Sequence, residues 1–306
     1  MEALKERLGE SAFIQRQIRE VHLHEKEGDG RLLGGIEHKV DLYSILRKCL
    51  KFSGLWKRAV RNYLDTKLET NRVGIVDLPE AFNGFRILHL TDLHADLHDD
   101  FIEAVKQVIE PIEYDLLVIT GDFRSATFGD HTGATSAVIE LSRSFKADCY
   151  AVLGNHDSIE KVPRLEAVGI RFLLNEHVLL KRGNACLALV GIDDPNYYQT
   201  HNFEQAMAGI PEDCVKVLLS HSPETYKQAA QLGFDLQLSG HTHGGQICLP
   251  GGRVLIHDGT SPRRLFKGPW REGKLQGYTS RGTGGTGLPV RLNCPAEVTL
   301  HTLVVS

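Results

Sequence analysis

Aspartate, asparagine and histidine side chains follow five apolar segments of this chain, at the point where each segment ends. In order along the sequence, they lie in TDLH (91–94), TGD (120–122), GNHD (154–157), SHS (220–222) and GHTH (240–243). Together these motifs supply seven candidate metal ligands: Asp92, His94, Asp122, Asn155, His221, His241 and His243. Seven ligands are more than one ion needs, and they suit two ions that share a bridging carboxylate.

The donor types narrow the choice of metal. Oxygen and imidazole donors without a thiolate favour Mn, Fe, Zn or Co in a reactive site over a structural zinc knuckle, and we expect manganese first. Each short motif alone has an ordinary explanation, since a glycine and an aspartate after a strand commonly form a turn. A lone His221 before Ser222 and Pro223 could simply begin a helix. The ordered set, with every member at the end of an apolar run, is what indicates a metal site.

The segments that must position these side chains have the pattern of buried strands. They are RILHLT (86–91), DLLVIT (115–120), DCYAVL (148–153), VKVLLS (215–220) and DLQLS (235–239). Helical patterns at 101–110, 135–145 and 223–232 separate several of them. This alternation predicts an α/β domain, with a mixed sheet or a two-sheet sandwich and helices outside. Strand ends meet at one edge of a sheet, so we expect the ligands to converge there.

Spacing within two motifs gives a finer expectation. Asp92 and His94 are two residues apart, as are His241 and His243. In extended backbone, residues two apart point to the same side. Each pair is therefore expected to point the same way if its segment is extended.

The first 70 residues differ from the rest, and we expect a helical extension (1–70) before a catalytic domain (71–306). Apolar residues recur at helical spacing in 1–24, and the glycine-rich segment 28–35 interrupts the pattern. A stronger amphipathic helix is predicted in 42–68, with a basic outer face and a tryptophan. Such a helix can lie on an anionic membrane. Packing against the main domain is the other interpretation, and the one we favour.

Composition limits the class of protein. With 306 residues, 42% hydrophobic residues and a net charge of −4, the chain has the make-up of an ordinary soluble protein and no global attraction to nucleic acid. The six scattered cysteines form no CxxC pair, which favours reduced thiols. The N-terminus lacks the pattern of a signal peptide and no apolar run reaches about 18 residues, so we expect neither a signal peptide nor a transmembrane helix. We expect a cytoplasmic protein, with peripheral binding to the inner face of the membrane as an alternative.

As an ordered set, the motifs resemble those of the calcineurin-like metallophosphoesterases over roughly 85–245. The segments 239–252 and 280–303 resemble a bacterial branch of membrane-associated phosphodiesterases that includes UDP-2,3-diacylglucosamine diphosphatases of lipid A synthesis. The N-terminus departs from that branch, because a basic amphipathic segment stands where a membrane anchor is usual. The resemblance implies a four-layer sandwich of two mixed β-sheets flanked by helices, with an N-terminal helical extension.

The resemblance also implies roles for single residues. Asp92, His94 and His243 would hold one metal ion, Asn155, His221 and His241 would hold the other, and Asp122 would bridge them. A metal-bridging hydroxide would then attack phosphorus in line with the leaving oxygen. His156 would bind the phosphoryl group or protonate the leaving group, and Asp157 would orient the imidazole of His156.

Near the bridging aspartate the chain departs from this family a second time. Many relatives carry an acidic residue three positions after that aspartate, where this chain has Ser125, preceded by Arg124. A guanidinium at this place could bind a second phosphate bidentately, which would suit a diphosphate or nucleotide-linked substrate. The alternative, which we favour, is a structural or surface contact by Arg124.

These observations leave three hypotheses for function. The leading one is a dinuclear-metal hydrolase of phosphodiester or diphosphate bonds in a phosphorylated small molecule. The second is a UDP-2,3-diacylglucosamine diphosphatase that acts on a lipid-linked diphosphate at the membrane surface, with contact through 42–68. The third, a non-catalytic scaffold, predicts missing ligands, and none is missing. No specific nucleic-acid partner is expected. Outside the motifs, we expect surface or structural roles for His98, His131, His177 and His257, with His98 and His131 as further candidates for the rim of the pocket. Asp193 and Asp194 are expected to lie in a turn or to support the ligands rather than to bind metal.

Overall fold

The computed structural model of this chain describes residues 1–28, 36–254 and 261–306, and describes side chains within these ranges except over 21–42. Residues 29–35 of the glycine-rich segment, where the helical pattern was predicted to end, therefore lie outside the described residues, as does His257. Within the described ranges, every helix is too short or too polar to traverse a bilayer.

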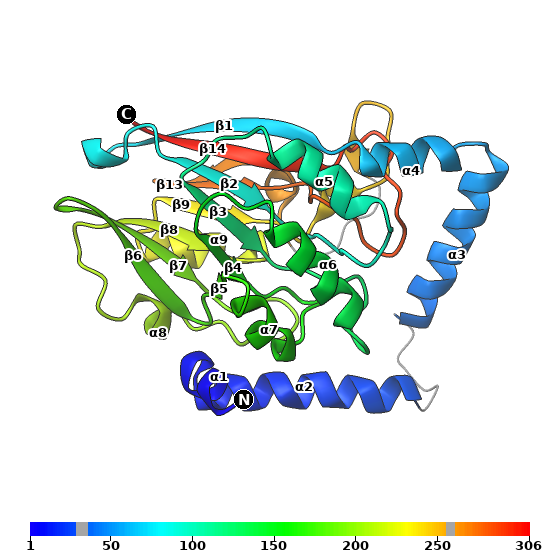
Figure 1. Cartoon of the computed structure of the whole chain (residues 1–306), viewed down its shortest axis with the longest axis horizontal. Helices are drawn as coiled ribbons and strands as arrows, with labels where there is room; N and C mark the ends of the chain where they lie inside the picture. Colours follow the sequence, from blue (N-terminus) through cyan, green and yellow to red (C-terminus); the bar gives the residue numbers. More distant parts are fainter. Residues whose placement is uncertain (29–35, 255–260) are drawn as a thin grey trace.

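Two six-stranded mixed sheets form the body of the molecule (Figure 1). The first has the order β1-β14-β2-β3-β4-β5 and the second the order β12-β13-β9-β8-β7-β6. The strands of the first sheet are β1 (Lys67–Ile75), β14 (Glu297–Val305), β2 (Arg86–Leu90), β3 (Leu116–Thr120), β4 (Cys149–Val152) and β5 (Ile170–Phe172). Those of the second are β12 (Gly268–Glu272), β13 (Leu275–Thr279), β9 (Leu236–Ser239), β8 (Val215–Leu219), β7 (Ala185–Gly191) and β6 (Glu176–Arg182). A separate two-stranded ribbon pairs β10 (Cys248–Leu249) with β11 (Arg253–Val254).

All five predicted core strands are confirmed as β2, β3, β4, β8 and β9. The first three run parallel to one another in the first sheet, and β8 and β9 run parallel in the second. Every residue of β3, β4 and β9 is buried. Strands covered on both faces need continuous apolar sequence, which explains why these runs do not alternate with polar residues.

Apolar side chains from the inner faces of both sheets, such as Ile87 and Val118 from the first and Val217 from the second, form a core between them. Two further clusters join each sheet to helices on its outer face. The principal covering helices are α5 (Phe101–Ile109), α6 (Thr132–Ser142), α7 (Val162–Glu166), α8 (Phe203–Met207) and α9 (Tyr226–Gln231). The layers are helix, sheet, sheet and helix, so the predicted fold class is confirmed.

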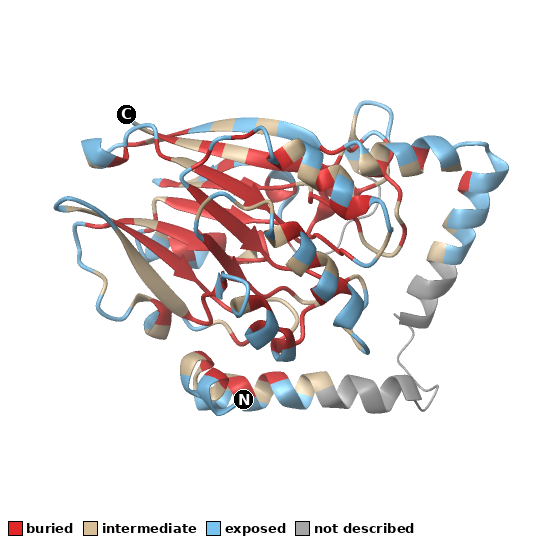
Figure 2. Cartoon of the chain, viewed as in Figure 1, coloured by how far each residue is buried: buried red, intermediate tan, exposed pale blue. Residues whose placement is uncertain are grey.

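Among the described residues before the first strand there are four helices: α1 (Glu2–Leu8), α2 (Glu10–Gly28), α3 (Ile36–Phe52) and α4 (Trp56–Leu64). The single helix predicted within 42–68 is instead two, because a turn at Ser53 and Gly54 divides it. Leu4, Leu8 and Phe13 are buried in the main core, so α1 and the start of α2 are docked on the catalytic domain (Figure 2).

The boundary predicted between residues 70 and 71 falls inside β1, which pairs with β14 over Lys67–Ile75. A strand hydrogen-bonded along its whole length belongs to its sheet. We therefore propose that the catalytic domain begins with β1 and that the extension ends after α4.

One prediction about the cysteines is wrong. Cys186 and Cys214 form a disulfide, with their Cα atoms 5.0 Å apart. Leu187 pairs with Val215 in the parallel register of β7 and β8, so the two cysteines occupy equivalent positions one residue earlier. This register was not visible in the scattered spacing. The other cysteines are free thiols: Cys49, Cys149, Cys248 and Cys294.

Thiol counting tests this pairing. In denaturant without reductant, a chromogenic thiol reagent should detect four thiols per chain, and six after reduction. The Cys186→Ser/Cys214→Ser variant is the control, because it should give four in both conditions. Six thiols before reduction in the unmodified chain would contradict the disulfide.

Candidate metal centre

The loops that carry the predicted ligands are tied to one another by backbone hydrogen bonds. The amide of Asp92 donates to Gly121 O at 3.0 Å, and the amide of His94 donates to Asp122 O at 3.0 Å. In the second sheet, Gly240 N donates to His221 O at 2.8 Å. These bonds continue the strand pairing beyond the strand ends, so the loops converge as expected.

The backbone at the ligands is not extended, so the condition for the expected alignment within each pair is not met. Five candidate ligands have positive φ angles: Asp92 (51°), His94 (41°), Asp122 (58°), His241 (71°) and His243 (50°). Residues with a side chain adopt this left-handed region seldom, at a cost of roughly 1–3 kcal/mol each. Such strain persists where the surroundings dictate the backbone, and it clusters at functional sites.

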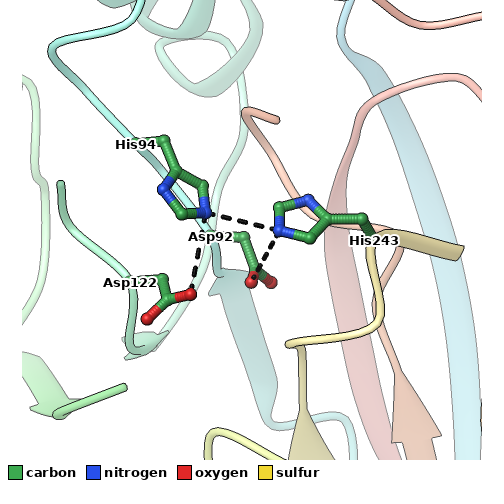
Figure 3. A group of neighbouring side chains, drawn as sticks. All are labelled: Asp92, His94, Asp122 and His243. Atoms are coloured by element: carbon green, nitrogen blue, oxygen red, sulfur yellow. Dashed lines mark hydrogen bonds and ion pairs between the residues drawn. The ribbon is translucent and has the colours of Figure 1, made fainter. Parts of the chain in front are cut away.

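Four of the candidate ligands, Asp92, His94, Asp122 and His243, lie close together (Figure 3). His94 Nε2 lies 3.3 Å from His243 Nε2 and 3.6 Å from Asp122 Oδ2. His243 Nε2 lies 3.4 Å from Asp92 Oδ1. One donor atom from each of these residues lies within 4.8 Å of all the others, and all four residues are buried. The group is therefore a candidate metal site.

A second group adjoins the first. Asn155 Oδ1 lies 3.0 Å from His221 Nε2 and 2.9 Å from His241 Nδ1. His221 Nε2 lies 3.3 Å from Asp122 Oδ2, the same oxygen that faces His94. The structure thus brings all seven predicted ligands together in two groups that meet at one carboxylate oxygen.

Backbone carbonyls orient two of the imidazoles. His94 Nδ1 donates to Arg124 O at 2.7 Å, and His221 Nδ1 donates to Thr120 O at 2.7 Å. A carbonyl oxygen can only accept, so in each neutral ring the proton sits on Nδ1 and the lone pair on Nε2. Both Nε2 atoms face the candidate metal positions, which is the state that metal binding requires.

Burial and neighbouring charges displace the pKa values of several candidate ligands from their usual ranges. Burial raises the pKa of Asp92 to about 7 and lowers the pKa of His94 to about 4. Burial also disfavours the charged form of His221, but the adjacent Asp122 carboxylate outweighs it and raises the pKa of His221 to about 10. Such displacements, produced by burial together with a specific charged partner, are typical of functional sites.

Two glycines allow the backbone to approach the carboxylates. A Cβ atom on Gly154 would lie 2.2 Å from Asp122 Oδ1, and one on Gly240 would lie 2.2 Å from Asp92 Oδ2. Both distances are far below a van der Waals contact. No residue with a side chain can therefore occupy either position while the carboxylates stay in place.

His156 lies at the edge of the first group. Its ring centroid is 5.1 Å from that of His94 in an edge-to-face arrangement, and its Nδ1 is 3.2 Å from the Thr127 hydroxyl. Like the neighbouring Asn155, and unlike the other candidate ligands, His156 is only half-buried. It is therefore placed to meet a molecule that enters the site from solvent.

Asp157 has partners other than the one predicted for it, and its role in orienting the imidazole of His156 remains a prediction. Its carboxylate does not bind the imidazole of His156, but accepts hydrogen bonds from the backbone amides of Asp122 at 2.7 Å, Phe123 at 3.0 Å and Gly154 at 2.9 Å. Lys161 Nζ also contacts it. A buried carboxylate that accepts several donors is well satisfied. Asp157 therefore joins the two loops that carry Asp122 and Asn155.

The substrate contact proposed for Arg124 remains a prediction, and the structure supports the alternative. Arg124 is 3% exposed. Its Nε donates to His156 O at 2.7 Å, and its terminal nitrogens donate to Gly129 O at 2.6 Å and to Thr127 O. Each guanidinium nitrogen is thus bound to a backbone carbonyl, and the side chain holds the 127–129 loop against His156.

Asn196 was missed by sequence reasoning. Its side-chain amide lies 2.8 Å from His241 Nε2, on the side of the ring away from Asn155. The carboxylate of Asp194 shapes this loop, because it accepts from the amides of Tyr197 and Tyr198 at 2.7 Å each. The structural role expected of Asp194 agrees with these bonds. Nothing in the local sequence distinguishes Asn196 from an ordinary loop asparagine.

The calcineurin-like phosphoesterase family model matches residues 85–245. The uncharacterized metallophosphoesterase YkoQ of Bacillus subtilis is 31% identical over 80% of this chain and 93% of its own. The phosphodiesterase YaeI of Escherichia coli is 30% identical over 72% of this chain and 82% of its own. Among solved structures, the calcineurin-like phosphoesterase YfkN of Bacillus subtilis has 18% identity and a TM-score of 0.35 over 53% of this chain and 72% of that one.

The close approach at Gly154 generates a prediction. Gly154→Ala should displace the Asp122 carboxylate, because the new methyl group and Oδ1 cannot both fit. Manganese retained after desalting, measured by atomic emission, should fall at least severalfold. Gly133→Ala is the matched control, since a Cβ there meets nothing within 4 Å and alanine favours the helix. Equal metal content in the two variants would show that the approach does not constrain the site.

Proposed function

Because this chain belongs to the calcineurin-like phosphoesterase family, we propose that it hydrolyses phosphodiester or diphosphate bonds with two divalent metal ions. That it is a metal-dependent phosphoesterase follows from the family and from relatives named as phosphodiesterase and metallophosphoesterase. The observation that carries the dinuclear proposal is the position of Asp122 Oδ2, which faces His94 at 3.6 Å and His221 at 3.3 Å.

The proposed ligand assignment follows the two groups: Asp92, His94 and His243 hold one ion, Asn155, His221 and His241 hold the other, and Asp122 bridges them. Carboxylate, amide and imidazole donors fit Mn²⁺, which we propose as the metal, as well as Fe, Zn or Co. Two bound cations supply the activation of a water nucleophile and neutralise phosphoryl charge. The protein's part is to fix the donors in a dry, preorganised arrangement.

His156 is proposed to act on the substrate directly. The Thr127 hydroxyl contacts its Nδ1 at 3.2 Å, so the other ring nitrogen, Nε2, is the one assigned to the substrate. There it donates a hydrogen bond to the phosphoryl group or passes its proton to the leaving oxygen. Arg124 supports this placement, because it binds the carbonyl oxygen of His156 at 2.7 Å.

A membrane-lipid substrate of the UDP-2,3-diacylglucosamine kind is the second candidate, and the surface of α3 and α4 favours it. Residues 43–64 contain no carboxylate, and their exposed cations are Arg47, Lys48, Lys51, Lys57, Arg58 and Arg61. At the turn between the helices, Phe52 is 98% exposed. Each cation near an anionic bilayer contributes about 1 kcal/mol. We propose that this surface makes peripheral contact with the anionic inner face of the membrane.

Metal dependence gives the first test of the proposed function. The manganese-loaded protein should hydrolyse bis-p-nitrophenyl phosphate, and chelation should abolish the activity. Asp122→Ala should lose bound metal and activity together, because both groups share this carboxylate. A variant that kept two metal equivalents per chain would contradict the bridging role.

A second test separates chemistry from metal binding. His156→Ala should retain metal, since its imidazole is not assigned to either ion. It should nevertheless lose roughly 10²–10⁴-fold in kcat, the usual contribution of a general acid. Unchanged kcat in this variant, measured with a phosphodiester whose leaving alcohol is weakly acidic, would refute the role.

Vesicle sedimentation tests the membrane contact. The protein should sediment with vesicles that contain anionic phospholipid but not with neutral ones, and salt should weaken binding. Lys51→Glu/Lys57→Glu should abolish sedimentation while hydrolysis of the small ester stays unchanged. Equal sedimentation of the variant and the unmodified chain would exclude this surface as the contact.

A further inference from the structure

Helix α2 lies outside the segment matched by the family, yet it contacts the loop that carries His156. Arg16, on α2, has a fully buried side chain. Its guanidinium pairs with Asp193 at 2.6 Å, donates to the carbonyl oxygen of Asp157, and lies 3.9 Å from the centre of the Tyr198 ring. A buried cation with this many partners is held firmly in place.

Glu20 contacts the same loop one helical turn later. Its carboxylate accepts from the backbone amide of Ile159 at 3.1 Å and from the hydroxyl of Ser158 at 3.0 Å. It also pairs with Arg16 Nε at 3.3 Å. The residues that follow His156 are thus bound to a single turn of α2.

On its inner side the loop is bound to the metal centre. The amide of His156 donates to Asp122 Oδ1 at 2.9 Å, and the amide of Gly154 donates to the Asp157 carboxylate at 2.9 Å. The imidazole of His156 is held by the Thr127 hydroxyl. The position of the His156 imidazole therefore depends strongly on the backbone of residues 156–159. Helix α2 supports this backbone from one side and Asp122 from the other.

We propose that Arg16 and Glu20 are positioning residues for His156, so that the N-terminal extension takes part in the reaction by holding this loop. The inference rests on the role proposed for His156. It extends the functional unit of this chain beyond the family's matched region of 85–245. Misplacement of a reacting group by about 1 Å can lower a rate by roughly 10²-fold, so modest support of a loop is enough to matter.

Glu20 is the better of the two residues to change. Removal of Arg16 would leave the Asp193 carboxylate buried without its partner, which can unfold the protein. The Glu20 side chain is 17% exposed, so Glu20→Ala leaves a cavity that water can enter. Glu20→Gln is the conservative variant, because its amide oxygen can still accept from Ile159 N.

The first measurement compares turnover with a matched control. Glu20→Ala should lower kcat about tenfold with bound metal, KM and thermal midpoint close to those of the unmodified protein, and Glu20→Gln should recover most of the loss. Glu10→Ala is the control, because it removes a carboxylate from the same helix. The Glu10 side chain is 68% exposed and pairs with a residue of α1, Lys5, at 2.6 Å. Loss of a metal equivalent from Glu20→Ala would overturn the assignment to His156.

The second measurement asks whether Glu20 acts through His156. If it does, the loss in Glu20→Ala should grow as the leaving alcohol of the ester becomes less acidic, since proton donation then matters more. In a double-mutant cycle, Glu20→Ala should lower kcat less than twofold when His156 is already alanine. A full tenfold loss in that background would overturn the inference.

The outcomes distinguish this inference from the proposed function. If His156→Ala retained the full rate, the role proposed for His156 would fail and this inference with it. If His156→Ala lost activity while Glu20→Ala behaved like Glu10→Ala, the role of His156 would stand and only the positioning by α2 would be rejected.

Discussion

The Asp122 carboxylate is the point on which the arrangement of the site depends. One of its oxygens faces His94 and His221, and the other accepts the amide of His156. This single side chain therefore touches both ligand groups and the loop of the proposed proton donor. Its own place is set by a left-handed backbone and by the carboxylate of Asp157, which binds its amide. Any shift of Asp122 would disturb both ligand groups at once.

The surrounding residues can be understood as support for that carboxylate. Gly154 leaves room beside the Asp122 carboxylate. Asp157 joins the loop of Asp122 to the loop of Gly154. Arg124 holds the 127–129 loop against His156 by donating to the carbonyl oxygens of His156 and Gly129. Buried polar groups stabilise a structure only when each finds its partners. In this site the partners are mostly backbone amides and carbonyls, so the loop geometry and the electrostatics cannot be changed independently.

Residue types and order were enough to predict the five core strands, the fold class and the seven candidate ligands, because strand ends converge and metal donors are chemically distinctive. The partners of Asp157 were not predicted, because most of them are backbone amides, which nearly every residue possesses. The Cys186–Cys214 bond depends on strand register, and the contacts of Arg16 and Glu20 depend on how α2 docks. Contacts between segments distant in sequence leave little local signal, although the i,i+4 spacing of Arg16 and Glu20 was visible.

The place of β14 in the first sheet has a consequence for how the protein is made. This strand lies between β1 and β2 and pairs with both, yet it is synthesised after all the other strands that the structure describes. Until it arrives, one edge of β2 has no neighbour in the sheet, and an unpaired edge invites association with other nascent chains. Cells that synthesise this protein would therefore benefit from chaperone protection of β2 until β14 has been synthesised.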